Sequence, residues 1–199
     1  MHDLKPWFGD PPHTSAPDMP GYWQSSHEQI NIGKVSVVGV VLIPLWFMLV
    51  VSTIAILGGR SEYSVEFSFT VILILAVLIV AVVLMHELVH GAVAALLGAK
   101  PAFGVGPGFA YTTFLEPMSK SSYLAVGLAP LVLLTAGAIG VALAWPALAG
   151  WMVVAATINA SGAIGDLWMT WRIVRAPRGS MFYDLADGFA VYVPADTPS

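Results

Sequence analysis

Two histidines four residues apart are the side chains of this sequence whose type and spacing best suit chemistry. They stand in the run His86-Glu87-Leu88-Val89-His90. Residues i and i+4 lie on one face of a helix, close enough to hold one metal ion. Glu87 is rotated from His86 by about 100° around a helix axis, so its carboxylate can reach water at the metal without being a ligand. This is the arrangement of zinc peptidases, in which Zn²⁺ polarises the scissile carbonyl and acidifies a water, and the glutamate accepts the proton.

A third protein ligand is expected, because catalytic zinc usually has three of them and one open position. The chain has no cysteine, which excludes thiolate ligands and cysteine nucleophiles. Outside the termini, the motif itself and the loop near Arg60, only Glu116 and Asp166 carry a carboxylate. Asp166 lies inside an apolar stretch and shares a helical face with Asn159, whereas Glu116 precedes a proline in a loop. The sequence therefore predicts Asp166 as the third ligand, with Glu116 as the alternative.

The composition is that of a membrane protein. Of the 199 residues, 57% are hydrophobic and only 10% are charged, and the mean hydropathy is +0.80. Soluble domains carry about 25% charged residues. The shortage of charge excludes an ordinary soluble globule and a disordered chain, and it also excludes a nucleic-acid partner, which needs a basic face.

Four apolar stretches are each long enough to cross a bilayer. They run over about residues 35–57, 67–97, 123–145 and 151–174. A helix needs about 20 residues to cross a hydrocarbon core of about 30 Å. Pro44 and Pro130 should kink or bound their helices, which membranes tolerate when neighbours satisfy the freed carbonyl. The sequence predicts an all-α membrane protein with about four transmembrane helices embedded in the lipid bilayer.

The remaining segments and the basic residues predict a topology. Residues 1–34 form a polar, Pro-rich N-terminal segment, residues 35–176 the four-span domain, and residues 177–199 a short tail. Four spans put both termini on one side, which then holds seven of the 8 Lys and Arg residues, against Arg60 alone on the other. Lys and Arg accumulate on the cytoplasmic side. Both termini are therefore expected to be cytoplasmic, in a multi-pass protein of the cytoplasmic membrane.

The metal motif is expected in the inner half of the membrane. Residues 71–85 contain no charge, and then three ionisable side chains appear within five positions. A charge at the membrane centre costs about 2.5–3.5 kcal/mol, so such residues normally face the interior and have partners. A helix from Phe67 to His86 rises about 28 Å, which brings the motif close to the cytosol.

The connection between the second and third stretches, residues 98–122, is rich in Gly, Pro and aromatic residues. Its glycines at 104, 106 and 108 do not fit a phosphate-binding fingerprint, which needs a preceding strand and a following helix. The pattern predicts a Gly-rich hairpin or re-entrant loop at the cytoplasmic face. A peptide can add as a strand to the edge of such a loop.

Over roughly residues 70–175 the chain resembles the DUF3267 family of membrane zincin peptidases. The resemblance is carried by His-Glu-Leu-Val-His-Gly at 86–91, Tyr-Thr-Thr at 111–113, Leu-Ala-Pro-Leu at 128–131 and Asn-x-x-Gly-x-x-Gly-Asp at 159–166. It implies a membrane metallopeptidase fold.

A looser similarity is to the site-2 proteases, intramembrane metalloproteases with His-Glu-x-x-His on one span and an Asn and an Asp on a later one. It implies that His86, His90 and Asp166 are ligands, that Glu87 is the base and that Asn159 binds substrate. This chain departs from the site-2 pattern, because Gly precedes Asp166 and no prolines separate it from Asn159.

These observations predict a membrane-embedded zinc-dependent metalloendopeptidase that hydrolyses a peptide or membrane-protein substrate near the cytoplasmic side. The first alternative is a non-catalytic membrane interaction protein with a structural metal. The second is a metal or proton carrier. A carrier should line a whole crossing with polar residues, and residues 71–83 are apolar throughout, which argues against it.

Overall fold

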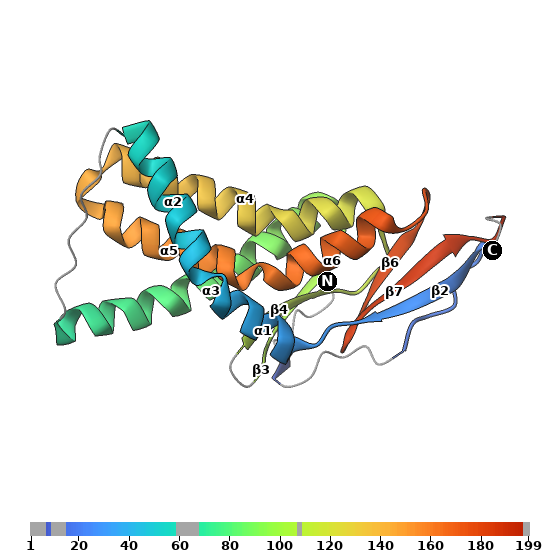
Figure 1. Cartoon of the computed structure of the whole chain (residues 1–199). Coiled ribbons are helices and arrows are strands. Elements are labelled where there is room, and N and C mark those ends of the chain that lie inside the picture. Colours follow the sequence, from blue (N-terminus) through green and yellow to red (C-terminus); the bar gives the residue numbers. More distant parts are fainter. Residues whose placement is uncertain (1–6, 9–14, 59–67, 107–108, 197–199) are drawn as a thin grey trace. The chain divides into compact units, whose positions relative to one another are not determined.

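The computed structural model describes residues 7–8, 15–58, 68–106 and 109–196 of the chain (Figure 1). Its helices are α1 (Ile32–Val41), α2 (Ile43–Gly58), α3 (Phe69–Leu96), α4 (Lys120–Ala144), the short 3₁₀ helix η1 (Pro146–Leu148), α5 (Ala149–Gly162) and α6 (Ile164–Arg175). Its strands are β1 (Trp7–Phe8), β2 (Tyr22–Gln29), β3 (Pro101–Gly106), β4 (Phe109–Phe114), β5 (Met118–Ser119), β6 (Met181–Leu185) and β7 (Gly188–Pro194). Its contacts form two compact units, one of residues 1–32, 87–128 and 165–199, the other of residues 33–86 and 129–164.

Several helices are candidate membrane spans, in agreement with the sequence. By length and composition, α3 and α4 can each cross a membrane alone, and the bent pairs α1–α2 and η1/α5–α6 raise the number of candidate spans from 2 to 4. Large apolar side chains point outward along α3, where Val77 is 70% exposed. A contiguous apolar surface of this kind is rare on soluble proteins, and lipid would cover it.

Each of the two bent helix pairs has a break between its helices. α1 ends at Val41 and α2 begins at Ile43, just before Pro44, with a bend of 48°. Proline suits the first turn of a helix, where its missing N–H is not needed, and this confirms the prediction that Pro44 bounds a helix. The predicted stretch 151–174 is in fact two helices, α5 and α6, bent by 45° at Ala163. The break lies between Gly162 and Gly165, and glycine is a weak helix former.

The prediction of an all-α protein is wrong, because the chain also forms two sheets. A three-stranded sheet has the order β1-β3-β4, and a four-stranded antiparallel sheet has the order β2-β7-β6-β5. β3 and β4 are antiparallel, with Pro101 opposite Phe114 and Gly106 opposite Phe109, so the predicted hairpin in the Gly-rich connection is confirmed.

The four-stranded sheet joins the two polar ends of the chain (Figure 1). β2 of the N-terminal segment pairs with β7 of the tail, from Tyr22 opposite Pro194 to Gln29 opposite Gly188. Gly188 has a φ of 153°, and a Cβ added there would lie 1.9 Å from the carbonyl oxygen of Glu28. Only glycine therefore allows the two strands to approach at this point.

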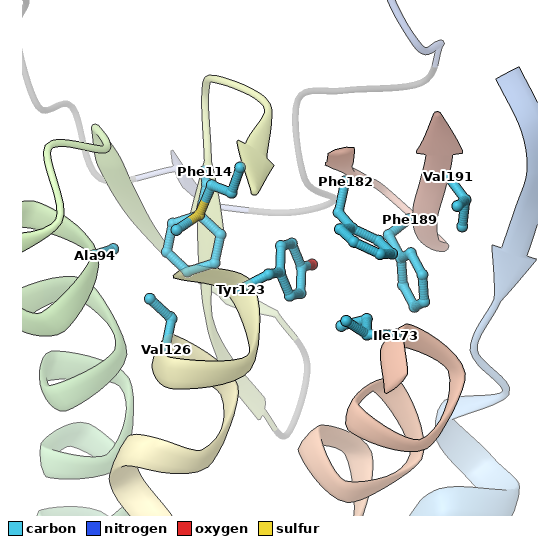
Figure 2. Close-up of a cluster of buried hydrophobic side chains, with 9 residues drawn as sticks. Ala94, Phe114, Tyr123, Val126, Ile173, Phe182, Phe189 and Val191 are labelled. Carbon is cyan, nitrogen blue, oxygen red and sulfur yellow. The ribbon is translucent and has the colours of Figure 1, made fainter. Parts of the chain in front are cut away.

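The first unit has an aromatic core. It consists of Ala94, Phe114, Met118, Tyr123, Val126, Ile173, Phe182, Phe189 and Val191 (Figure 2). The ring of Tyr123 stacks edge-on against Phe114 at 6.0 Å and lies 5.7 Å from the ring of Phe182. This core packs the ends of α3, α4 and α6 against the hairpin and the four-stranded sheet.

One carboxylate lies within this aromatic core. Asp184 of β6 is 8% exposed, and it accepts hydrogen bonds from the hydroxyl of Tyr123 and, at 3.0 Å, from the backbone N–H of Phe114. Burial raises the pKa of Asp184 from 3.8 to about 6, although the hydrogen bonds from Tyr123 and Phe114 act in the opposite direction.

The second unit has a core of small and branched apolar side chains from its helices. Its core consists of Val50, Ile54, Ala138, Ala142, Ala149, Val153 and Ala156. The alanines let the backbones of α2, α4 and α5 approach closely, which is the usual way in which helices associate within a membrane.

Candidate metal centre

Helix α3 carries both histidines of the motif on one face. It runs without a break from Phe69 to Leu96, so the helix itself fixes the position of His86 relative to His90. His86 is 8% exposed and His90 is 7% exposed. Two buried imidazoles on successive turns are therefore presented together, as the sequence predicts.

Asp166 completes a group of three potential ligands. One ligand atom from each of His86, His90 and Asp166 lies within 4.8 Å of the other two. Nε2 of His90 and Oδ1 of Asp166 are 3.4 Å apart. Two ligand atoms at about 2.1 Å from one tetrahedral zinc ion are separated by roughly the same distance. Asp166 reaches this place from the first turn of α6, just after the break at Ala163.

The ring of His90 is oriented by a backbone carbonyl of α4. Its Nδ1 lies 2.9 Å from the carbonyl oxygen of Val126. A carbonyl oxygen can only accept, so Nδ1 carries a proton and Nε2 is the ring nitrogen that is available to a metal. Metal-binding histidines usually donate their second ring nitrogen in this way, which fixes both the tautomer and the ring plane.

The ring of His86 is oriented by Asn159 of α5. Nδ1 of His86 lies 2.9 Å from Oδ1 of Asn159. The amide nitrogen of Asn159 donates to the carbonyl of Pro130 at 3.1 Å and to the hydroxyl of Thr135 at 3.2 Å. The carbonyl of Pro130 can only accept, which identifies the nitrogen end of the amide. Oδ1 therefore accepts a hydrogen bond from Nδ1–H of His86, and Nε2 is the ring nitrogen that could bind a metal. The donor set thus fits zinc in its spacing and in the orientation of both rings.

Glu87 lies beside the histidines and contacts the hairpin. The hydroxyl of Thr112, in β4, lies 2.8 Å from Oε2 of Glu87 and 2.9 Å from the backbone oxygen of the same residue. A hydroxyl has one proton, so it donates to one of these oxygens at a time. The hairpin thereby restrains the side chain that the sequence predicts to be the base.

Gly91 allows the hairpin to pack against α3 next to the motif. A Cβ added at this position would lie 2.2 Å from Cζ of Phe103, in β3. The ring of Phe103 thus occupies the space that any other side chain at 91 would need. The glycine that follows His90 in the sequence is therefore explained by contact with β3.

The alternative third ligand is placed elsewhere. The side chain of Glu116 is 44% exposed and forms an ion pair with Lys100. Among the described residues, the group that could hold a metal contains Asp166 and not Glu116. The sequence analysis did not identify Thr112, Thr135 or the carbonyl of Val126 as parts of the site. Thr112 lies in the Tyr-Thr-Thr run at 111–113, and Pro130 signals a freed carbonyl one turn earlier, so two of these three had a sequence signal.

The structure combines helices long and apolar enough to cross a membrane with a buried His-His-Asp group that could hold a metal ion. The chain belongs to the DUF3267 family, whose description is "Putative zincin peptidase". The family model matches residues 78–181, which is just over half of the chain, from α3 to the start of β6. The resemblance found in the sequence is thus confirmed. Comparison with curated proteins and with solved structures gave no match.

Proposed function

We propose that this chain is a zinc-dependent metalloendopeptidase of the cytoplasmic membrane, which hydrolyses peptide bonds near the cytoplasmic side. The observation that carries the proposal is the convergence of His86, His90 and Asp166, with each imidazole oriented by a hydrogen bond at Nδ1. The family description supports a peptidase, and the candidate membrane helices support a site at the bilayer.

Nε2 of His86, Nε2 of His90 and the carboxylate of Asp166 would hold the zinc ion. When bound, zinc supplies a Lewis acid that polarises a carbonyl and lowers the pKa of a water to about 7.

Glu87 is the proposed general base and then the general acid. Its carboxylate accepts the proton of the attacking water and returns it to the leaving amide nitrogen. The hydroxyl of Thr112 hydrogen-bonds to one oxygen of this carboxylate and limits its rotation. The donated Nδ1–H groups of the two histidines hold the rings still while this exchange takes place.

The outer edge of β4 is the proposed docking site for the substrate. β4 is an edge strand of the order β1-β3-β4. The N–H of Leu115 donates to Lys100 on the β3 side, whereas the N–H of Phe114 donates to Asp184. The backbone N–H and C=O groups of successive residues point to opposite sides of a strand. Those of Thr112 therefore face the outer edge of β4, as those of Phe114 do. A peptide that adds there as a strand passes the residue that contacts Glu87.

The same proposal includes the topology. With the positively charged side inward, both termini, the hairpin and the ends of α3 and α6 that follow the metal site lie toward the cytosol. Of the residues on which this rests, Lys5 and Arg60 lie outside the described residues.

The test separates metal binding from turnover. In detergent-purified protein, zinc content and hydrolysis of an unstructured peptide substrate are measured for wild type and for Glu87→Gln. Gln keeps the shape but cannot accept a proton, so zinc should remain at about one equivalent while turnover falls by about 10²–10⁴-fold. Hydrolysis that survives Glu87→Gln would refute the mechanism and leave a structural metal as the better interpretation.

The ligand assignment has its own matched pair of variants. Asp166→Ala should lower zinc affinity, because two imidazoles alone hold the ion poorly, and Glu116→Ala, which removes an exposed carboxylate in an ion pair, should not. The reverse result would show that Glu116, in the connection after the hairpin, is the third ligand.

A further inference from the structure

Pro130 creates an unpaired carbonyl in the middle of α4. In an α-helix the N–H of residue 130 would donate to the carbonyl of residue 126. Proline has no N–H, and its ring also pushes the carbonyl four residues earlier away from the helix axis. Val126 and Pro130 are both fully buried, so water does not replace the missing donor. A buried carbonyl without a hydrogen-bond partner is costly. The carbonyl of Val126 therefore needs a donor from another part of the chain.

His90 is that donor. Its Nδ1 lies 2.9 Å from the oxygen of Val126. The hydrogen bond that orients the ring of this predicted metal ligand thus uses the one acceptor that the proline releases.

The same turn of α4 also supports the other histidine. The carbonyl of Pro130 accepts the amide nitrogen of Asn159 at 3.1 Å, and Oδ1 of Asn159 accepts Nδ1 of His86. Two carbonyls four residues apart on α4 therefore support two imidazoles four residues apart on α3. The carbonyl of Val126 does so directly, and that of Pro130 does so through Asn159. The spacing is the same because both are set by one helical turn.

We propose that Pro130 is a positioning residue of the metal centre. By withholding its N–H, it leaves the carbonyl of Val126 to Nδ1–H of His90, which fixes the tautomer and turns Nε2 toward the metal. The inference rests on the proposed zinc site and deepens it. Loss of such an outer contact typically lowers metal affinity by about 10–100-fold.

A purely structural role for Pro130 makes the opposite prediction for stability. Alanine at 130 supplies the missing N–H and is a far better helix former. This gain offsets the loss of the His90 hydrogen bond, so the metal-free Pro130→Ala protein should unfold at about the same temperature as wild type, although its zinc affinity falls. A proline that merely shaped the helix would lower both together when replaced.

The experiment uses the full chain in detergent with zinc as the ligand. Zinc affinity is measured by competition with a chelator for wild type, Pro130→Ala, Pro130→Gly and Leu131→Ala, and the ¹⁵N shifts of the His90 ring are measured in the metal-free proteins. Gly also restores the N–H, and so provides a second variant if Ala does not fold. Leu131→Ala changes the adjacent side chain but not the hydrogen bonding at 130, and serves as the control.

We expect both Pro130 variants to bind zinc about tenfold or more weakly and to populate both tautomers of His90, and Leu131→Ala to match wild type. Unchanged zinc affinity together with a single Nδ1–H tautomer in Pro130→Ala would overturn the inference. The nitrogen shifts are measured without metal, so absence of zinc binding by wild type would overturn the proposed function and leave the tautomer result as the separate test of Pro130.

Discussion

Replacing Asn159 by alanine tests whether this residue holds a metal ligand or a substrate. Asn159 is 2% exposed, and its amide makes hydrogen bonds to His86, Pro130 and Thr135. In Asn159→Ala the buried Nδ1–H of His86 loses its amide acceptor, which costs about 1–3 kcal/mol. The ring can then rotate or exchange tautomer, so zinc affinity should fall by about 10–100-fold, or about 1.4–2.7 kcal/mol.

The matched control is Thr157→Ala in the same helix. Thr157 is 6% exposed, and its hydroxyl donates to the carbonyl of Val153 within α5. The control therefore removes a polar group that is about as buried as Asn159 but whose hydrogen bond lies within α5 instead of on a histidine ring. Both variants are compared with wild type by chelator competition for zinc and by thermal unfolding without metal. We expect weaker zinc binding in Asn159→Ala alone.

Unchanged zinc affinity in Asn159→Ala would refute the reasoning from the hydrogen bonds. If hydrolysis also fell sharply while zinc stayed bound, Asn159 would bind substrate, as the similarity to site-2 proteases implies. The substrate role and the ligand-holding role thus predict different results in the same variant.

Three further predictions concern other parts of the chain. Because the folded pKa of Asp184 is raised to about 6, its ionised form opposes folding, and this cost is absent below about pH 4 and complete above about pH 6. Unfolding curves should therefore show wild type losing up to about 3 kcal/mol relative to Asp184→Asn between about pH 4 and pH 7; parallel pH profiles would contradict this. Gly91→Ala should destabilise the protein by about 1–3 kcal/mol through overlap with Phe103, whereas Gly140→Ala, where an added Cβ meets no atom within 4 Å apart from the adjoining backbone of its own helix, should be neutral or stabilising in the same melts. Reporter fusions at Ser199 and in the loop at Arg60 should give opposite signals, and equal signals would exclude an even number of spans.

Local chemistry explains why the helices and half of the site could be predicted. A run of about 20 apolar residues determines a membrane helix without reference to the rest of the chain. The helical turn likewise sets the spacing of His86 and His90, so two ligands could be recognised from five residues. The hairpin was predictable for the same reason, since its Gly and Pro residues act locally.

The remaining features depend on contacts between distant residues. β2 has no recognisable strand pattern by itself, because its exposure follows from pairing with β7 at the other end of the sequence. The sequence favours Asp166 over Glu116 because of its apolar surroundings, but the distance of 3.4 Å between Asp166 and His90 depends on the packing of distant helices and follows from no local pattern. The acceptor for His90 is the backbone oxygen of Val126. Every residue has such an oxygen, so the type of the residue does not reveal this role.

The pairing of β2 with β7 also orders events during synthesis. His27 and Asp187 hydrogen-bond to each other although they are 160 positions apart, and Nε of Arg172 reaches Glu28 at 2.7 Å. At about 5–20 residues per second, a ribosome needs roughly 8–30 s to make the chain between these two strands. The candidate membrane helices are made during this time, before residues 22–29 have their partner strand. The β2–β7 pair therefore forms only after these helices have been made, and a nascent chain released before Gly188 would carry an open strand edge, a substrate for chaperones and proteases.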